Sequence, residues 1–123
     1  MIEHIPQINQ SKILKHSQKK IEVGEDGYVL IENILLEPLV SQSGFLTNVE
    51  DADEYSDGGV IVCGTDGDFA YYKYDQSTNN YLQSKLPIKI TDDCIYSIES
   101  FEKDNHKYFK CYGEKNIIYE FKI

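Results

Sequence analysis

Closely spaced carboxylates are the side chains of this sequence that come nearest to a catalytic pattern. Asp66 and Asp68 are separated by one residue and would share one face of a strand. Two carboxyl groups on one surface can cleave a glycosidic bond, one as the acid and the other as the base or nucleophile. Asp51, Asp53 and Asp57 have a spacing close to that of a calcium-binding loop, but the bidentate glutamate of such a loop is missing. A solvated acidic loop is the favoured interpretation of these three residues.

Other patterns for catalysis or ligand binding are weaker. The glycines of Gly58-Gly59 and Gly64–Gly67 lack the lysine and the following helix that a phosphate-binding loop needs. His4, His16 and His106 are isolated from one another, and the sequence contains neither a Cys-x-x-Cys pair nor a Gly-x-Ser-x-Gly elbow. We therefore expect no catalytic residues, no metal site and no cofactor. A protein that acts by binding fits this sequence better than an enzyme.

The charge of the chain is concentrated in one block. The sequence has 12 basic residues, all lysine, against 21 acidic residues, for a net charge of −9. Residues 21–72 contain twelve of the acidic residues and no basic residue. This balance argues against nucleic acid and against an anionic membrane surface as partners. The absence of arginine argues further against phosphate recognition.

The elements that must position these residues are mostly strands. Gly24–Gly27 is a strong turn signal in the first half of the chain. Along the second half, apolar and polar residues alternate with period two, and turn signals such as Gly64–Gly67 separate the runs. We predict a single domain over residues 1–123, mainly β, with an antiparallel meander that forms a sandwich or small barrel. An α+β fold is the second choice. Phe45–Val49 is predicted as a short strand and Glu50–Gly59 as a polar acidic loop.

The N-terminal residues are harder to assign. Ile2, Ile5, Ile8 and Ile13 could line one face of a short helix. Met1–Gln10 is too polar for a secretory signal peptide, so we expect a cytoplasmic protein.

Ten tyrosines form the most distinctive aromatic group. Tyr71, Tyr72 and Tyr74 fall in one predicted strand and must point to both of its faces, so at least one face is expected to show tyrosine to solvent or a partner. Tyr55 stands within the predicted acidic loop, where a large ring is difficult to explain as core. Because tyrosine is enriched at interface hot spots, we expect Tyr55 to be an anchor for a binding partner.

The segment Asp57–Asp75 (DGGVIVCGTDGDFAYYKYD) resembles the SUKH superfamily of bacterial toxin-immunity proteins. The resemblance is carried by an apolar strand at Val60–Cys63, a turn at Gly64–Gly67 and an aromatic strand at Phe69–Asp75. It implies an inhibitor that protects a bacterium from its own or a neighbour's toxin.

Electrostatics favours the same class of partner. A nuclease toxin needs a positive cleft to hold polyphosphate, and an acidic surface with tyrosines can fill that cleft and accelerate encounter. We predict that one copy of this chain binds one basic toxin, with a nuclease domain as the expected class. The residues predicted to form the binding surface are Glu50, Asp51, Asp53, Glu54, Tyr55, Asp57, Asp66, Asp68, Tyr71 and Tyr72.

Two other functions stay open from the sequence. A phage protein that mimics nucleic acid and blocks a host defence enzyme would use the same acidic surface. A small carbohydrate-acting hydrolase would use paired carboxylates in a deep cleft. A toxin gene immediately upstream would favour immunity, and neighbouring phage structural genes would favour the mimic.

Overall fold

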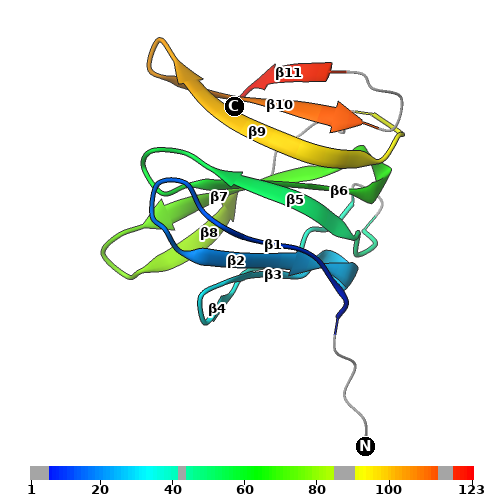
Figure 1. Ribbon diagram of the computed structural model, residues 1–123, viewed down its shortest axis with the longest axis horizontal. Coiled ribbons are helices and arrows are strands. Elements are labelled where there is room, and N and C mark those ends of the chain that lie inside the picture. Colours follow the sequence, from blue (N-terminus) through cyan, green and yellow to red (C-terminus); the bar gives the residue numbers. More distant parts are fainter. Residues whose placement is uncertain (1–5, 42–43, 85–90, 114–117) are drawn as a thin grey trace, which may run out of the picture.

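Three antiparallel sheets stacked face to face make up the computed structural model (Figure 1). The structure describes residues 6–41, 44–84, 91–113 and 118–123. The first sheet contains β1 (Ile8–Ile13), β2 (Lys20–Gly24), β3 (Val29–Ile31) and β4 (Ile34–Leu35). The second contains β5 (Val49–Glu54), β6 (Val60–Gly64), β7 (Phe69–Asp75) and β8 (Asn80–Ser84). The third contains β9 (Ile95–Lys103), β10 (His106–Gly113) and β11 (Ile118–Lys122).

The mainly β prediction is confirmed, and so is the antiparallel meander within each sheet. The strands form three separate sheets, none of which closes into a barrel. The central sheet explains this arrangement because both of its faces are apolar. Val60 and Val62 of β6 pack toward the first sheet, whereas Ile61 and Cys63 pack toward the third. A sheet with two apolar faces must be covered on both sides.

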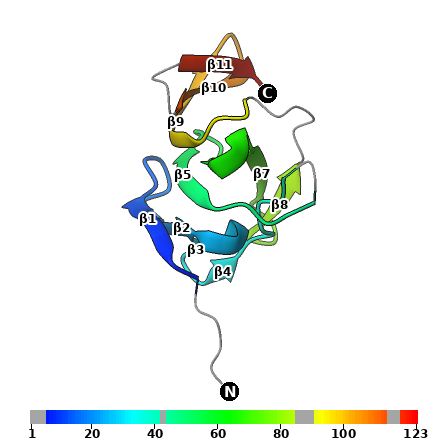
Figure 2. The ribbon, with the colours of Figure 1, turned by 90° about the vertical axis from the view of Figure 1, so that its right-hand side faces the viewer.

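Each sheet repeats one local design. The second strand of the sheet ends at a buried glycine, namely Gly24, Gly64 or Gly113. That glycine pairs with the first residue of the sheet's first strand, and a register shift lies beside the pair. The first two sheets are four-stranded meanders of this kind, and the third contains three described strands. The repetition places the corresponding turns of the first two sheets, which follow Gly24 and Gly64, at the same end of the stack (Figures 1 and 2).

Two of these corresponding turns are short 3-10 turns, η1 (Glu25–Gly27) and η2 (Thr65–Gly67). In each, the central aspartate has a left-handed backbone, with φ of 58° at Asp26 and 66° at Asp66. Asp and Asn are among the few non-glycine residues that adopt this conformation at low cost. The turn signals recognised at Gly24–Gly27 and Gly64–Gly67 are therefore confirmed.

Three predicted elements differ from the structure. The predicted short strand Phe45–Val49 has only an isolated bridge at Leu46, and Val49 begins β5. Residues 8–13 form strand β1, not a helix, because they pair with β2 across the turn that follows Leu14. Ile2 and Ile5 of the predicted helix lie outside the described residues. The predicted acidic loop Glu50–Gly59 is strand β5 as far as Glu54 and a tight turn beyond it. Asp and Glu have low intrinsic strand propensity, but tertiary partners override it here.

The first strands of the three sheets, β1, β5 and β9, lie side by side along one edge of the stack (Figures 1 and 2). β5 is the middle one, so its side chains reach both neighbouring sheets. Among the described residues, no helix has the length and apolar character needed to cross a membrane.

Candidate functional site

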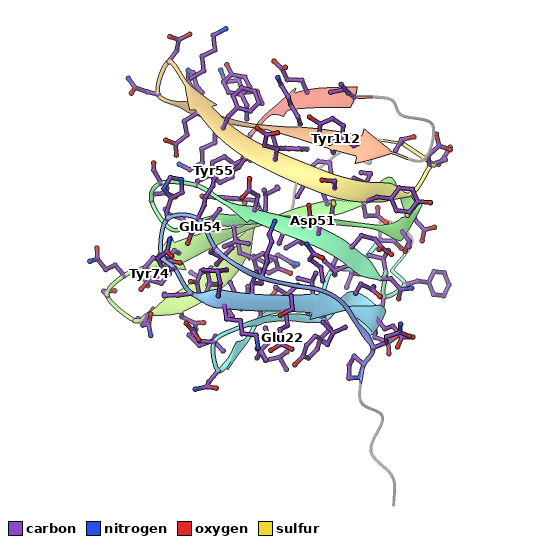
Figure 3. The ribbon with its side chains drawn as sticks, in the orientation of Figure 1. Glu22, Asp51, Glu54, Tyr55, Tyr74 and Tyr112 are labelled. Carbon is purple, nitrogen blue, oxygen red and sulfur yellow. The ribbon has the colours of Figure 1, made fainter. Side chains whose placement is uncertain are left out.

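Carboxylates on β5 join the three sheets along this edge (Figure 3). Asp51 is 7% exposed. Its Oδ1 accepts a hydrogen bond from Lys12 Nζ of β1 at 3.1 Å, and its Oδ2 accepts one from the backbone N–H of Ile98 in β9 at 2.8 Å. One side chain therefore bridges the first and third sheets. We call the three β5 carboxylates Asp51, Asp53 and Glu54, together with the groups that donate hydrogen bonds to them, the carboxylate seam.

Asp53 continues the seam one pleat further along β5. Its Oδ2 accepts hydrogen bonds from Lys15 Nζ at 3.0 Å and from the Ser100 backbone N–H at 2.6 Å. Ser100 Oγ lies 3.0 Å from the same Oδ2 and 2.7 Å from the Glu54 carbonyl oxygen, and its one proton is donated to either acceptor. Burial opposes the charged form of Asp53, but the bonds from Ser100 and Lys15 outweigh it and hold the pKa below its ordinary value.

Glu54 closes the seam and is fully buried. Its Oε1 accepts the backbone N–H groups of His16 and Ser17 at 2.7 and 2.8 Å. These groups lie in the turn between β1 and β2, where the backbone makes no strand bonds. The carboxylate therefore satisfies two N–H groups of that turn and fixes the turn against the second sheet.

The lowered pKa of Asp53 predicts an acid-sensitive fold. Because the folded pKa is below the unfolded value of about 3.9, the stabilisation is complete above that pH and is lost as the pH falls through the folded pKa. We expect the free energy of unfolding to decrease steeply below about pH 4. Urea denaturation from pH 2.5 to 6 measures this, and Asp53→Asn should show a shallower decrease. If the free energy of unfolding decreases equally with falling pH in the wild type and in Asp53→Asn, Asp53 is not the source of the acid sensitivity.

The predicted tyrosine anchors are core residues. Tyr55 is buried, and its hydroxyl donates to the carbonyl of Tyr108 at 2.7 Å. Burial, with smaller effects from Tyr71 and Asp53, raises the pKa of Tyr55 above its ordinary value. Tyr71 contacts the Tyr55 ring edge-on in the core beneath the third sheet. Tyr72 faces the first sheet, and its hydroxyl donates to the carbonyl of Glu37 at 2.5 Å.

Tyr71 and Tyr72 thus point to opposite faces of β7, as predicted, but neither face shows them to solvent. The expectation of a tyrosine-bearing open face is wrong for this pair because sheets cover both sides of β7.

The remaining predicted site residues are dispersed. Glu50 is half-buried, and burial raises its pKa. Asp57 is exposed and forms an ion pair with Lys107 at 2.8 Å. Asp66 is exposed in η2, whereas Asp68 is buried. The expected shared strand face of Asp66 and Asp68 is wrong because Asp66 belongs to the turn before β7. The structure brings Asp51, Asp53 and Glu54 together as one unit, and it packs Tyr55 against Tyr71 in the core.

A second acidic feature is assembled at the end of the stack that carries η1 and η2. Asp26 N–H donates to Asn48 Oδ1 at 3.4 Å, and Thr65 N–H donates to Asn48 O at 3.0 Å. These bonds place the two turns next to each other, and Gly67 lies against the carbonyl of Thr91 before β9. The charged side chains of residues 24–28, 64–68 and 91–94 are all acidic: Glu25, Asp26, Asp66, Asp68, Asp92 and Asp93. We call this group of residues the acidic end; Asp68 is its buried member, and the other five reach the surface.

Sequence reasoning selected only Asp66 and Asp68 from the acidic end. A usable signal was present, because Gly-Glu-Asp-Gly at Gly24–Gly27 and Gly-Thr-Asp-Gly at Gly64–Gly67 repeat one pattern. Equivalent turns in repeated sheets lie at the same end, so the repeat would have grouped Asp26 with Asp66.

An open hollow of about 440 Å³ lies at the opposite end, between the turn after β5 and the turn between β9 and β10. Ser56 Oγ donates to the Glu102 carboxylate there, with distances of 2.8 and 2.7 Å to its two oxygens. Asp57 and Lys107 pair on the same hollow. Acidic and basic groups are mixed on this surface, and it does not include Asp66 or Asp68.

Comparison with known proteins adds no relative. No protein-family model matches this chain, and no curated protein matches it.

Proposed function

We propose that this protein binds and neutralises a basic protein through its acidic end, and that the partner is a bacterial toxin, most simply a nuclease. The observation that carries the proposal is the acidic end itself, where turns from successive sheets bring Glu25, Asp26 and Asp66 onto one surface. The toxin-immunity class comes from the resemblance of Asp57–Asp75 to the SUKH superfamily.

The acidic end suits this task for two physical reasons. Loops held by a rigid sheet scaffold are the usual place for binding residues. A surface of one charge sign raises the association rate with an oppositely charged cleft, in a manner that weakens with salt. The carboxylate seam does not serve the proposal, because Asp51, Asp53 and Glu54 are buried.

The proposal predicts a loss of association rate when charge is removed from the acidic end. Asp26→Asn combined with Asp66→Asn keeps residues that tolerate the left-handed backbone at these positions. We expect association with the toxin to slow by roughly fivefold to tenfold at low salt, with a smaller difference at high salt. Stopped-flow association kinetics with the purified toxin domain, identified by capture from the native host, measures this.

Asp104→Asn is the matched control. Asp104 is also exposed and left-handed, with φ of 52°, but it lies in the turn between β9 and β10 at the opposite end. Equal slowing by the control would contradict the acidic end as the contact. Capture of a nucleic-acid-binding defence enzyme in place of a toxin would contradict the immunity role.

A further inference from the structure

We infer that the side chains of Phe45 and Leu46 form an apolar anchor on the acidic end, and that this anchor inserts into an apolar pocket on a cationic protein. The inference rests on the proposed function, because the acidic end supplies the charge that would orient the partner. It adds the group that would hold the partner after encounter.

Phe45 is the most exposed large apolar residue of the described chain, at 74%. Its neighbour Leu46 is 53% exposed, and Val40 on the facing strand is 41% exposed. Val40 and Leu46 form an antiparallel bridge, so the three side chains belong to one small hairpin. Exposed apolar groups gathered on one element mark interaction sites more often than scattered single residues do.

The backbone on either side of Phe45 is held in place. Ser41 N–H donates to the Phe45 carbonyl at 2.8 Å, and Phe45 N–H donates to Ser41 Oγ at 3.2 Å. An anchor on an ordered backbone loses little conformational freedom when it binds.

The base of the hairpin is bonded to both turns of the acidic end. Leu39 N–H donates to the Gly27 carbonyl of η1 at 3.1 Å. Thr47 Oγ1 donates to the Thr65 carbonyl of η2 at 3.0 Å. The segment that carries Phe45 and Leu46 is therefore tied at Leu39 and Thr47 to the two turns whose Asp26 and Asp66 are exposed.

The chemistry of the partner follows from this juxtaposition. A central apolar anchor with a charged rim is the usual anatomy of a specific protein interface. The rim here is acidic, so a complementary partner carries lysine or arginine around an apolar pocket. A second copy of this chain would bring acidic rims together and is disfavoured by repulsion.

Two probes separate the anchor from the charge. Poly-L-lysine offers cationic groups alone, and a random lysine–phenylalanine copolymer of equal charge adds apolar groups. We expect the wild type to bind the copolymer about tenfold more tightly than poly-L-lysine by fluorescence anisotropy. Phe45→Ser should remove that difference and leave poly-L-lysine binding unchanged. Because Phe45 is largely exposed, the thermal unfolding midpoint of the Phe45→Ser variant should match that of the wild type.

Leu82→Ser is the matched control, because Leu82 is 57% exposed on β8, outside the hairpin. If Leu82→Ser weakens copolymer binding as much as Phe45→Ser, or if Phe45→Ser has no effect, the anchor is overturned. If poly-L-lysine fails to bind but Phe45→Ser still weakens the copolymer, the acidic end fails as a binding surface while the anchor stands. Self-association of the wild type that Phe45→Ser abolishes, seen by sedimentation velocity, would overturn the cationic partner.

Discussion

Gly67→Ala is expected to destabilise the fold by more than about 3 kcal/mol. Gly67 has a left-handed backbone with φ of +72°, which costs any residue with a Cβ. An added Cβ would also lie 1.8 Å from the carbonyl oxygen of Thr91. That oxygen belongs to the backbone leading into β9, so relief requires the third sheet to move away from η2. Urea denaturation followed by circular dichroism measures the loss.

Gly44→Ala separates the two causes. Gly44 also has a positive φ, +90°, but an added Cβ would meet no described atom within 4 Å. We expect a loss of about 1 to 2 kcal/mol there from backbone strain alone. Equal losses at the two positions would show that the close approach of η2 to Thr91 contributes nothing to stability.

Asp53→Ala is expected to lower the free energy of unfolding by about 2 to 4 kcal/mol. The substitution removes the acceptor of the bonds from Lys15 Nζ and from the buried Ser100 backbone N–H, whereas Ser100 Oγ keeps the Glu54 carbonyl at 2.7 Å. It also leaves Lys15 without its ion pair. The loss should appear in urea denaturation at pH 7 and shrink at low pH, where the wild-type carboxylate is itself protonated.

Asp57→Ala provides the comparison with an exposed pair. Asp57 lies 2.8 Å from Lys107, but its side chain is 52% exposed and that of Lys107 is 30% exposed. Such a pair contributes less than about 1 kcal/mol. If Asp57→Ala and Asp53→Ala destabilise the protein equally, burial does not determine how much a carboxylate of the seam contributes to the free energy of unfolding.

Because some acidic residues of the block 21–72 are buried and others are exposed, a test of partner binding must substitute the exposed ones. Charge reversal at Asp51, Asp53 and Glu54 would place lysines in the seam beside Lys12 and Lys15. Such a variant would unfold and would report nothing on binding. Asp26 and Asp66 are exposed in turns, and substitution there tests the surface itself.

Local pattern was sufficient for strands such as β6 and β7 and for most turns, but not for β1 and β5. The apolar run Val60–Cys63 and the aromatic run Phe69–Asp75 predicted β6 and β7 because β-branched and aromatic residues favour strands. Gly24–Gly27 and Gly64–Gly67 predicted turns because Gly and Asp tolerate left-handed backbone. Because a strand places successive side chains on opposite faces, Tyr71 and Tyr72 were predicted on opposite faces of one strand.

The number of sheets, and therefore the exposure of each face, was decided only by the tertiary structure. Periodicity shows that a strand has two faces, but it does not show what covers either one. Tyr71 became core because the third sheet covers its side of β7. Asp51 and Asp53 became structural because Lys12 of β1, Lys15 of the turn after β1 and the N–H groups of β9 reach them from segments distant in sequence. Carboxylate burial depends on such distant partners, which a local sequence pattern does not contain.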